Sequence, residues 1–481
     1  MSISQLQNYF FKYIIVLLSL TLFFIYGIIT GYEPIIGFVL FIGLSYVIAY
    51  YYSPTWFAYL YIFTVSFAAL LQLPVTEGGF SSAVAIALSS FALGIFGALA
   101  VKERNLIKIF FGRIDQILPI LFFMLMVVSM MNSRELGFSA KQIQQFFYLL
   151  VIYYFLHLTI LNRDVFQKAF FVVLLGGIIV GLLGLLEVIL QTPVYFLLGN
   201  KSLFGASVSD ALLNAKMGRI NGAIGDAPFH GIYMTMIASV SLYFFFTAQR
   251  IIFRIPYIFI FLVSVFNVMG TGSRGAFIAM LLALFIFWAL SEIAHKSAIM
   301  MTTFLAAATL VIVMVILIPN LDVTRSFTFE KESTDTAEMR WENIPVAIKM
   351  FGDHPIIGNG PDGFVINYTR YASGLTKYAS REKTLKTHNT PLQILAEYGL
   401  VGITLFGLII FMSLKRMVAV MRKAEDKKDR MIAVALIAAI SAYIFFMATS
   451  NTLLDKYFWL LITMSQIHFS ICETTLAQKR V

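Results

Sequence analysis

Long apolar runs separated by short polar segments follow one another along the chain, and this pattern predicts membrane-spanning helices. About 18 apolar residues in a helix are enough to cross a hydrocarbon core of about 30 Å. Such runs fit helices better than the shorter alternating strands of a membrane β-barrel, because a segment in lipid has to pair its own backbone polar groups. The runs lie at about 11–30, 35–52, 55–73, 81–101, 116–131, 145–161, 168–190, 229–248, 253–270, 275–294, 298–318, 391–413, 431–449 and 456–472. We therefore expect an all-α, polytopic membrane protein with about 14 transmembrane helices.

Composition agrees with a membrane protein. Of the 481 residues, 59% are hydrophobic and 12% are charged, which is about half the charged share of an ordinary soluble domain. The single cysteine, Cys472, excludes an intramolecular disulfide framework and a zinc site built on cysteines. The first apolar run is long and is not followed by a small-residue cleavage site, so we expect a retained membrane helix rather than a signal peptide.

The distribution of lysine and arginine predicts the orientation in the membrane. Basic residues gather in alternate short loops, at 102–113, 163–168, 250–254, 296 and 415–430, whereas the opposite loops hold few. Positively charged loops stay in the cytoplasm, so we expect both termini on that side. The net charge of +10 is then a topology signal and an attraction to anionic membrane lipids, and we expect no nucleic-acid partner.

Two segments on the predicted outer side are too long to be simple connections. The predicted division of the chain is 1–190 for N-terminal transmembrane helices, 191–228 for an outer loop, 229–318 for central transmembrane helices, 319–390 for a large extracytoplasmic loop and 391–481 for C-terminal transmembrane helices. Within the large loop, residues 336–351 carry apolar side chains at helical spacing, which predicts an amphipathic helix on the membrane domain or at the headgroup level. Glycine- and proline-rich breakers at 352–355 and 358–361 should end it.

Three polar groups fall at the same outer edge when the helices are counted. Arg219 lies before the eighth run, Arg274 lies where the ninth run passes to the tenth with almost no loop, and His388 precedes the twelfth run. Ser273 and Asn389 stand next to two of these residues, and Glu397 lies about two turns into the twelfth helix. The predicted topology thus places two guanidinium groups and one imidazole on one side of the membrane.

Each of the three residues has two possible interpretations. Arg274 is either an arginine that extends to the outer interface or one that faces a cavity and binds an anion. Arg219 is a solvated loop charge or a phosphate ligand, and His388 is a polar residue at a helix start or a general base toward a sugar hydroxyl. Glu187, in the seventh run, is a functional carboxylate or a structural hydrogen-bonding group. The remaining histidines show no metal-site spacing, so we expect no metal and no cofactor.

Three stretches carry a resemblance to the O-antigen ligase and O-antigen polymerase superfamily of bacterial membrane glycosyltransferases. They are Ser-Arg-Gly-Ala at 273–276, His-Pro-Ile-Ile-Gly-Asn-Gly at 354–360 and the longer segment from His-Asn-Thr-Pro to Gly-Leu-Val-Gly at 388–402. Together they cover roughly 215–415, and the sequence departs from the family pattern at 225–228.

The resemblance implies that the chain transfers a glycan from undecaprenyl diphosphate to an acceptor hydroxyl without nucleotide or metal. It implies that Arg219 and Arg274 bind the diphosphate and that His388 takes the proton of the attacking hydroxyl. The expected localisation is the bacterial cytoplasmic (inner) membrane, with the site facing the periplasm or exterior. Lipid A core as acceptor would make the chain a ligase, another lipid-linked repeat unit would make it a polymerase, and protein O-glycosylation is a third option. A lipid-linked oligosaccharide flippase is an alternative of a different class.

Overall fold

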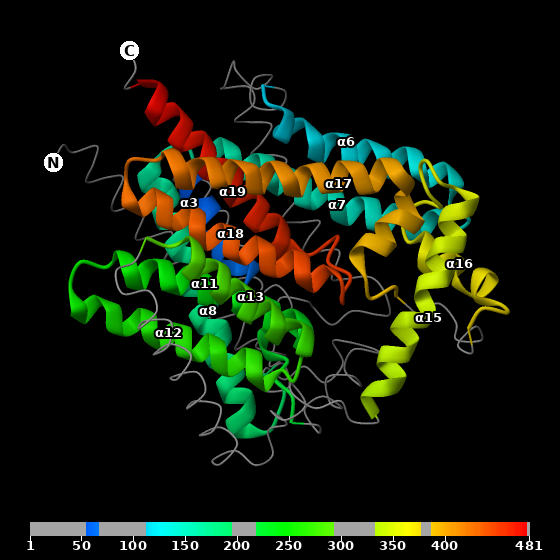
Figure 1. Ribbon diagram of the computed structural model, residues 1–481, viewed down its shortest axis with the longest axis horizontal. Helices are drawn as coiled ribbons and strands as arrows, with labels where there is room; N and C mark the ends of the chain where they lie inside the picture. Colours follow the sequence, from blue (N-terminus) through cyan, green and yellow to red (C-terminus); the bar gives the residue numbers. More distant parts are fainter. Residues whose placement is uncertain (1–53, 67–111, 195–217, 293–331, 377–385, 479–481) are drawn as a thin grey trace, which may run out of the picture.

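The computed structural model describes residues 54–66, 112–194, 218–292, 332–376 and 386–478, and its regular structure is entirely helical over these ranges (Figure 1). The α-helices are α3 (Pro54–Val65), α6 (Ile114–Ser129), α7 (Leu136–Thr159), α8 (Arg163–Leu190), α11 (Ala227–Thr247), α12 (Ile251–Gly270), α13 (Arg274–Leu290), α15 (Glu332–Asp353), α16 (Gly363–Ala372), α17 (Thr390–Lys423), α18 (Lys427–Met447) and α19 (Lys456–Gln478). Two short 3₁₀ turns are η1 (Met130–Asn132) and η2 (Gly222–Ile224). The predicted all-α class is confirmed for this part of the chain.

Six described helices are long and apolar enough to cross a membrane: α6 with η1, α8, α11, α12, α17 and α18. The helices α3 and α13 are apolar but shorter. The predicted runs at 11–30, 35–52, 81–101 and 298–318 lie outside the described residues. The count of fourteen spans therefore stays a prediction.

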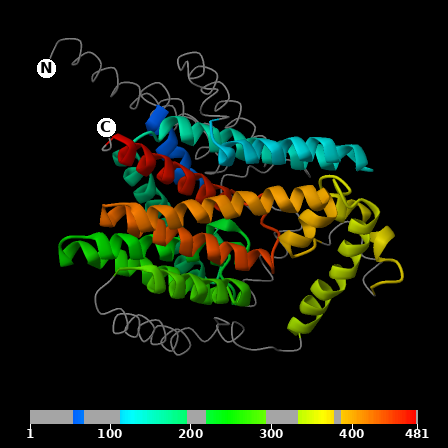
Figure 2. The ribbon, with the colours of Figure 1, turned by 45° about the horizontal axis from the view of Figure 1, so that its top comes forward.

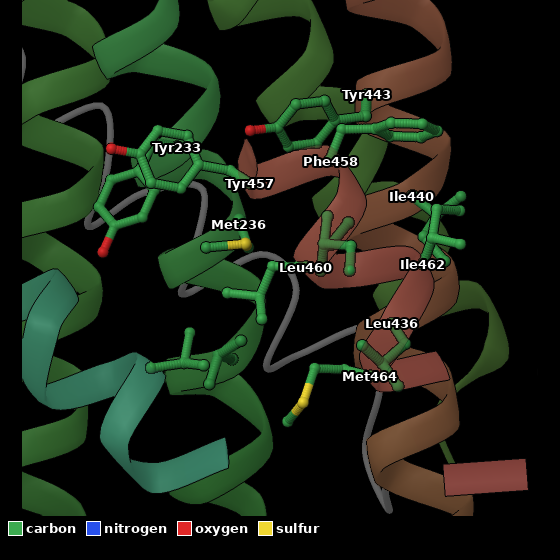
Figure 3. Close-up of a cluster of buried hydrophobic side chains, with 14 of the residues drawn as sticks. Tyr233, Met236, Leu436, Ile440, Tyr443, Tyr457, Phe458, Leu460, Ile462 and Met464 are labelled. Atoms are coloured by element: carbon green, nitrogen blue, oxygen red, sulfur yellow. The ribbon is translucent and has the colours of Figure 1, made fainter. Parts of the chain in front are cut away.

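The helices α11 and α18 form the centre of the bundle, because 78% of the most apolar stretch of each is buried, against 44–50% for the other four spans. Figure 3 shows how they meet α19 through a layer of aromatic and aliphatic side chains. The rings of Tyr233 in α11 and Tyr457 in α19 lie 4.5 Å apart between centroids. Both hydroxyls donate to Ser66 at the end of α3, at 2.8 Å to its Oγ and 3.4 Å to its carbonyl oxygen. Buried tyrosines thus tie three distant parts of the chain into one core.

Glycines let α8 approach its neighbours closely. A Cβ on Gly177 would lie 2.4 Å from Ile237 of α11, and one on Gly181 would lie 2.7 Å from Val263 of α12. Membrane helices without a hydrophobic driving force between them associate through such small-residue contacts. Asn267 of α12 adds a hydrogen bond of 3.0 Å from its Nδ2 to the carbonyl oxygen of Gly181. The position of α8 is therefore determined by side-chain size and one buried amide.

The two ends of the bundle differ in chemistry. At one end, Arg163 pairs with Asp429 at 3.1 Å and Arg430 pairs with Glu292 at 3.0 Å, so the predicted basic loops come together there. At the opposite end lie the α12–α13 turn, the start of α17 and the α18–α19 turn, with α15 and α16 beyond them (Figures 1 and 2). The three polar groups predicted to share one side are therefore at the same end.

The amphipathic helix predicted at 336–351 is part of α15, but its apolar stripe is not the face that packs on the protein. Trp341 and Ile348 of that stripe are 72% and 53% exposed. The packed face is offset from it and includes the fully buried Val346 and Met350. These residues contact buried aromatic residues of α16, such as Phe364, in a small core separate from that of the bundle. The helix ends at Asp353, where the sequence predicts breakers.

The helix α17 is broken at Gly399, whose φ of +62° is not helical. A break in a membrane-embedded helix leaves backbone groups without their usual partners. The segment at 355–360 supplies replacement partners on both sides of the break. Four backbone hydrogen bonds join the two stretches, from Asn359 to Ala396 at 3.0 Å, from Gly360 to Glu397 at 3.0 Å, from Leu400 to Pro355 at 2.9 Å and from Val401 to Ile356 at 3.2 Å. Two of the segments that carry the family resemblance are thus paired through their backbones.

This pairing requires glycine on both chains. A Cβ on Gly358, whose φ is +72°, would lie 2.2 Å from the carbonyl carbon of Glu397. A Cβ on Gly399 would lie 2.5 Å from the carbonyl of Ile356. The two backbones approach so closely that no side chain fits between them. The break in α17 and the segment at 355–360 therefore depend on each other.

We predict that Gly358→Ala lowers the free energy of unfolding by at least about 1–3 kcal/mol, because the left-handed backbone and the contact with Glu397 both disfavour a Cβ. The measurement is the thermal unfolding temperature in detergent. Gly352→Ala is the matched control, since a Cβ at Gly352 meets nothing within 4 Å. Equal unfolding temperatures for the two variants would show that the close contact does not hold the segment in place.

Candidate functional site

Arg219 lies against the α12–α13 turn. Its Nε donates to the carbonyl oxygen of Thr271 at 2.7 Å, and the amide of Ile220 donates to the carbonyl oxygen of Gly270 at 2.8 Å. The turn also presents Arg274, which is the first residue of α13. The two predicted arginines therefore flank one short turn, although 54 positions of the chain separate them.

Glu187 holds the loop that carries Arg219. Its carboxylate accepts from the amide of Gly222 at 2.6 Å and from the Nδ2 of Asn221 at 3.3 Å. The carboxylate is buried among these donors. Of the two interpretations of Glu187, the structural hydrogen-bonding role is the one observed.

Ser273 and Asn389 cap the two helices that start at the site. The Oγ of Ser273 accepts from the amide of Ala276 at 3.4 Å, and the Oδ1 of Asn389 accepts from the amide of Leu392 at 2.9 Å. Side-chain oxygens at this position satisfy amides that a helix start leaves without partners. Both predicted supporting residues therefore fix the start of a helix, Ser273 next to Arg274 and Asn389 next to His388.

His388 is positioned by the α18–α19 turn. Its backbone has φ of +49°, a left-handed conformation that non-glycine residues seldom adopt, and its amide donates to the Oδ1 of Asn451 at 2.7 Å. The flanking Asn389 donates from Nδ2 to the carbonyl oxygen of Ala448 at 3.1 Å, and Thr390 donates to that of Ser450 at 2.7 Å. Held strain of this kind occurs where the surroundings over-determine a conformation.

The same α18–α19 turn contacts the start of α13. A Cβ on Gly275 would lie 2.7 Å from the Oγ1 of Thr449, which places the residue after Arg274 directly against the turn. Residues 448–451 therefore contact both the start of α13, where Arg274 lies, and the segment that carries His388. A turn that belongs to none of the motifs thus links two of the three predicted groups.

Arg340 of α15 joins this group, and nothing in the sequence around it singles it out. Partial desolvation and the positive charge of Arg274 lower the pKa of Arg340. Burial, together with the charges of Arg340 and Lys386, lowers the pKa of His388 to about 4. The imidazole is therefore neutral at neutral pH, and it stands among cations. Such a cluster attracts an anionic group with several oxygens.

Glu397 lies at the α17 break and is 1% exposed. Its backbone carbonyl accepts from the Oγ of Ser129 at 2.9 Å, and its carboxylate accepts from the Nε2 of Gln393 at 3.2 Å. Gln393 in turn accepts from the Nδ2 of Asn451 at 2.7 Å. A chain of amides thus connects Glu397 to the residue that holds the backbone of His388.

A cavity of about 610 Å³ adjoins this network. Lys386, Thr387, Gln393, Glu397 and Asn451 form part of its wall. The rest comes from α7, from the start of α16 and from residues within 224–229 and 453–457. The site therefore has two described parts, a cluster of cations around a neutral imidazole and a hollow with a mixed polar lining beside it.

One group of potential metal ligands lies at the other end of the bundle. Asp429, His468 and Cys472 place their ligand atoms within 4.8 Å of one another. The Nε2 of His468 faces the backbone carbonyl oxygen of Asp429 at 3.1 Å, and Arg163 lies 3.1 Å from the carboxylate. The guanidinium of Arg163 already balances the charge of Asp429. The contact between His468 and Asp429 connects α18 to α19. Sequence spacing does not reveal the group, because Asp429 comes from a different helix.

The model of the O-antigen ligase family (Wzy_C) matches residues 259–407, about a third of the chain. This stretch contains Arg274, Arg340 and His388, whereas Arg219 lies before it. The apolar helices and this match indicate a multi-pass membrane protein that carries an O-antigen ligase domain. Over the matched stretch, the resemblance seen in the sequence is confirmed. A comparison with curated proteins gives no match.

We predict that Arg340→Gln raises the pKa of His388 from about 4 toward its ordinary value of 6.5, because the substitution removes one of the charges that lower it. The measurement is the pH dependence of diethyl pyrocarbonate modification of His388, followed by peptide mass spectrometry. The reagent attacks the neutral ring, so reactivity is lost as pH falls through the pKa. Lys349→Gln removes an exposed charge from the same helix and is the control. Identical pH profiles for the wild type and Arg340→Gln would show that Arg340 does not influence His388.

Proposed function

We propose that the chain is an O-antigen ligase-like glycosyltransferase that moves a glycan from undecaprenyl diphosphate to an acceptor hydroxyl, on lipid A core or a similar acceptor. One observation carries the proposal: the charges of Arg340 and Lys386 act on the neutral imidazole of His388, and the charge of Arg274 acts on Arg340, at one end of the bundle. Most of this cluster lies within the stretch that matches the O-antigen ligase family.

The arginines bind the diphosphate of the donor in this proposal. A guanidinium presents a planar set of donors that matches phosphate oxygens, and it keeps its charge at any working pH. Arg219 and Arg274 approach from the two sides of the α12–α13 turn, and Arg340 adds a third cation from α15. Fixed positive charge of this kind stabilises the negative charge that develops on a leaving diphosphate.

His388 acts as the general base toward the acceptor. The acceptor oxygen forms a bond to the anomeric carbon, its proton passes to the imidazole, and the bond from that carbon to the diphosphate oxygen breaks. The bonding electrons leave with undecaprenyl diphosphate, and the proton is later released to solvent. A neutral ring is the form that this role requires, and burial, together with the charges of Arg340 and Lys386, maintains it.

The site faces the periplasm or exterior of the bacterial cytoplasmic membrane in this proposal. The basic loops gather at the opposite end of the bundle, and positively charged loops favour the cytoplasm. The segments at 191–228 and 319–390 are then outer segments, with α15 and α16 belonging to the second. A donor lipid diffusing in the outer leaflet would bring its diphosphate to the level of the arginines.

Two alternative activities differ from the proposed one in their products. A polymerase of the same superfamily, for O-antigen, capsule or exopolysaccharide, would use the same donor chemistry and transfer to another lipid-linked repeat unit. A flippase would move lipid-linked oligosaccharide without forming a bond. The purified protein, given undecaprenyl-diphosphate-linked glycan with lipid A core or with a lipid-linked repeat unit, distinguishes these activities. Translocation with no new glycosidic bond would contradict the enzymatic proposal.

We predict that Arg274→Ala lowers kcat/KM for transfer by at least about 10²–10³, because one fixed charge at the leaving group is lost. Expression and unfolding temperature should stay at wild-type levels. Arg250→Ala, which removes an exposed arginine at the opposite end of the bundle, should leave transfer unchanged. Wild-type transfer by Arg274→Ala would mean that this arginine only extends to the membrane interface.

We predict that His388→Ala lowers kcat by about 10²–10⁴ while the dissociation constant for undecaprenyl diphosphate stays within a factor of two or so of the wild-type value. The reason is that the imidazole handles the acceptor proton, whereas the arginines bind the donor. Single-turnover transfer and direct binding of the lipid diphosphate separate the two effects. Unaltered turnover would exclude His388 as the base.

A further inference from the structure

The cavity beside the cationic cluster differs from it in charge. Its wall carries three lysines and four carboxylic acids, at Lys141, Lys386, Lys456, Asp226, Asp362, Glu397 and Asp455. The charges therefore nearly balance, whereas the arginine cluster is strongly positive. Neither His388 nor any of the three arginines lines the cavity among the described residues. A hollow with nearly balanced charges and a mixed polar and apolar lining suits an uncharged ligand with many hydroxyl groups better than a phosphate.

Paired amides and carboxylates line the hollow. The Nε2 of Gln142 donates to the Oδ1 of Asp362 at 2.9 Å, and the Nε2 of Gln393 donates to the Oε2 of Glu397 at 3.2 Å. A carboxylate has two oxygens with about four lone-pair positions, so each can accept from a ligand hydroxyl in addition to its amide. Burial raises the pKa of Asp362, while the charges of Lys386 and Lys141 lower it.

The remaining wall is partly aromatic. Phe138, Phe229, Phe364 and Tyr457 come from four different helices and line the same hollow. An aromatic face offers an apolar surface that packs against the C–H face of a sugar ring. The volume of about 610 Å³ lies within the range of about 300–1,000 Å³ typical of small-molecule sites.

We propose that this cavity is the saccharide subsite for the acceptor, with the amides and carboxylates of its wall receiving the acceptor's hydroxyl groups. The proposal rests on the proposed function and assigns the acceptor, which is the second substrate, to this cavity. Wall residues adjoin His388 on the side of Lys386, Thr387 and Asn451, so a sugar in the cavity has one edge next to the base.

The acceptor is favoured over the donor glycan by the direction of the reaction. In a displacement at the anomeric carbon, the attacking hydroxyl approaches from the side opposite the leaving diphosphate. None of the three proposed diphosphate-binding arginines lines the cavity, whereas Lys386 and Thr387, directly before His388, do. Residues within 224–229, which follow Arg219, also line it, so the cavity extends from the segment before His388 to the loop that carries Arg219. An acceptor in the cavity therefore reaches the base without occupying the place of the diphosphate.

Filling the cavity tests the assignment. Gln145 lies on the cavity wall and is exposed, so Gln145→Trp should occupy the hollow without disturbing the core. We expect KM for the acceptor to rise by about tenfold or more, with KM for undecaprenyl-diphosphate-linked glycan unchanged. Ala140→Trp places the same side chain at an exposed position of α7 outside the cavity wall, and it should leave both values unchanged.

Two results would overturn the assignment. One is an unchanged acceptor KM, whether or not the donor KM rises, and the other is an equal effect of the two tryptophans on the acceptor KM. Binding of the acceptor to the inactive His388→Ala protein, with and without Gln145→Trp, gives a second readout if turnover is too low to measure. If the wild-type protein catalyses transfer and one of these results is found, only the subsite is contradicted. The glycosyltransferase proposal is then unaffected.

Discussion

Backbone pairing across the broken helix α17 is the contact on which the rest of the site depends. Four hydrogen bonds replace those that the break at Gly399 removes, and they attach the segment at 355–360 to the bundle. That segment directly follows α15 and leads into α16, so it determines where Arg340 and Asp362 lie. In a membrane, unpaired backbone groups cost several kcal/mol each, on the order of 2–7 kcal/mol, so the two stretches are strongly bound to each other.

The α18–α19 turn completes the arrangement by contacting both the start of α13 and the segment that carries His388. One side of it contacts Gly275, next to Arg274, and the other side fixes the backbone of His388 through Asn451. A cluster of cations and a base held neutral by burial and by two of those cations are thus placed beside one another. An anionic donor would partly neutralise the cations when it binds, which would raise the basicity of the imidazole at the moment it is needed.

The sequence predicts the helices well but the contacts between them poorly. The helical class, the near absence of a loop before Arg274 and the end of α15 at Asp353 follow from apolar periodicity and breakers. Arg340 does not, because its relation to Arg274 and His388 arises only when α15 folds back on the bundle. The role of Asn451 cannot be predicted either, because no local sequence pattern distinguishes an asparagine in a short turn. The outward direction of Trp341 shows that an apolar stripe alone does not reveal which face packs.

An experimental structure of the protein with undecaprenyl diphosphate bound tests this site most directly. We predict that the diphosphate lies between Arg219, Arg274 and Arg340, with the imidazole of His388 between it and the cavity beside α7. A diphosphate bound elsewhere, or these side chains turned toward the acyl chains of the membrane, would contradict it.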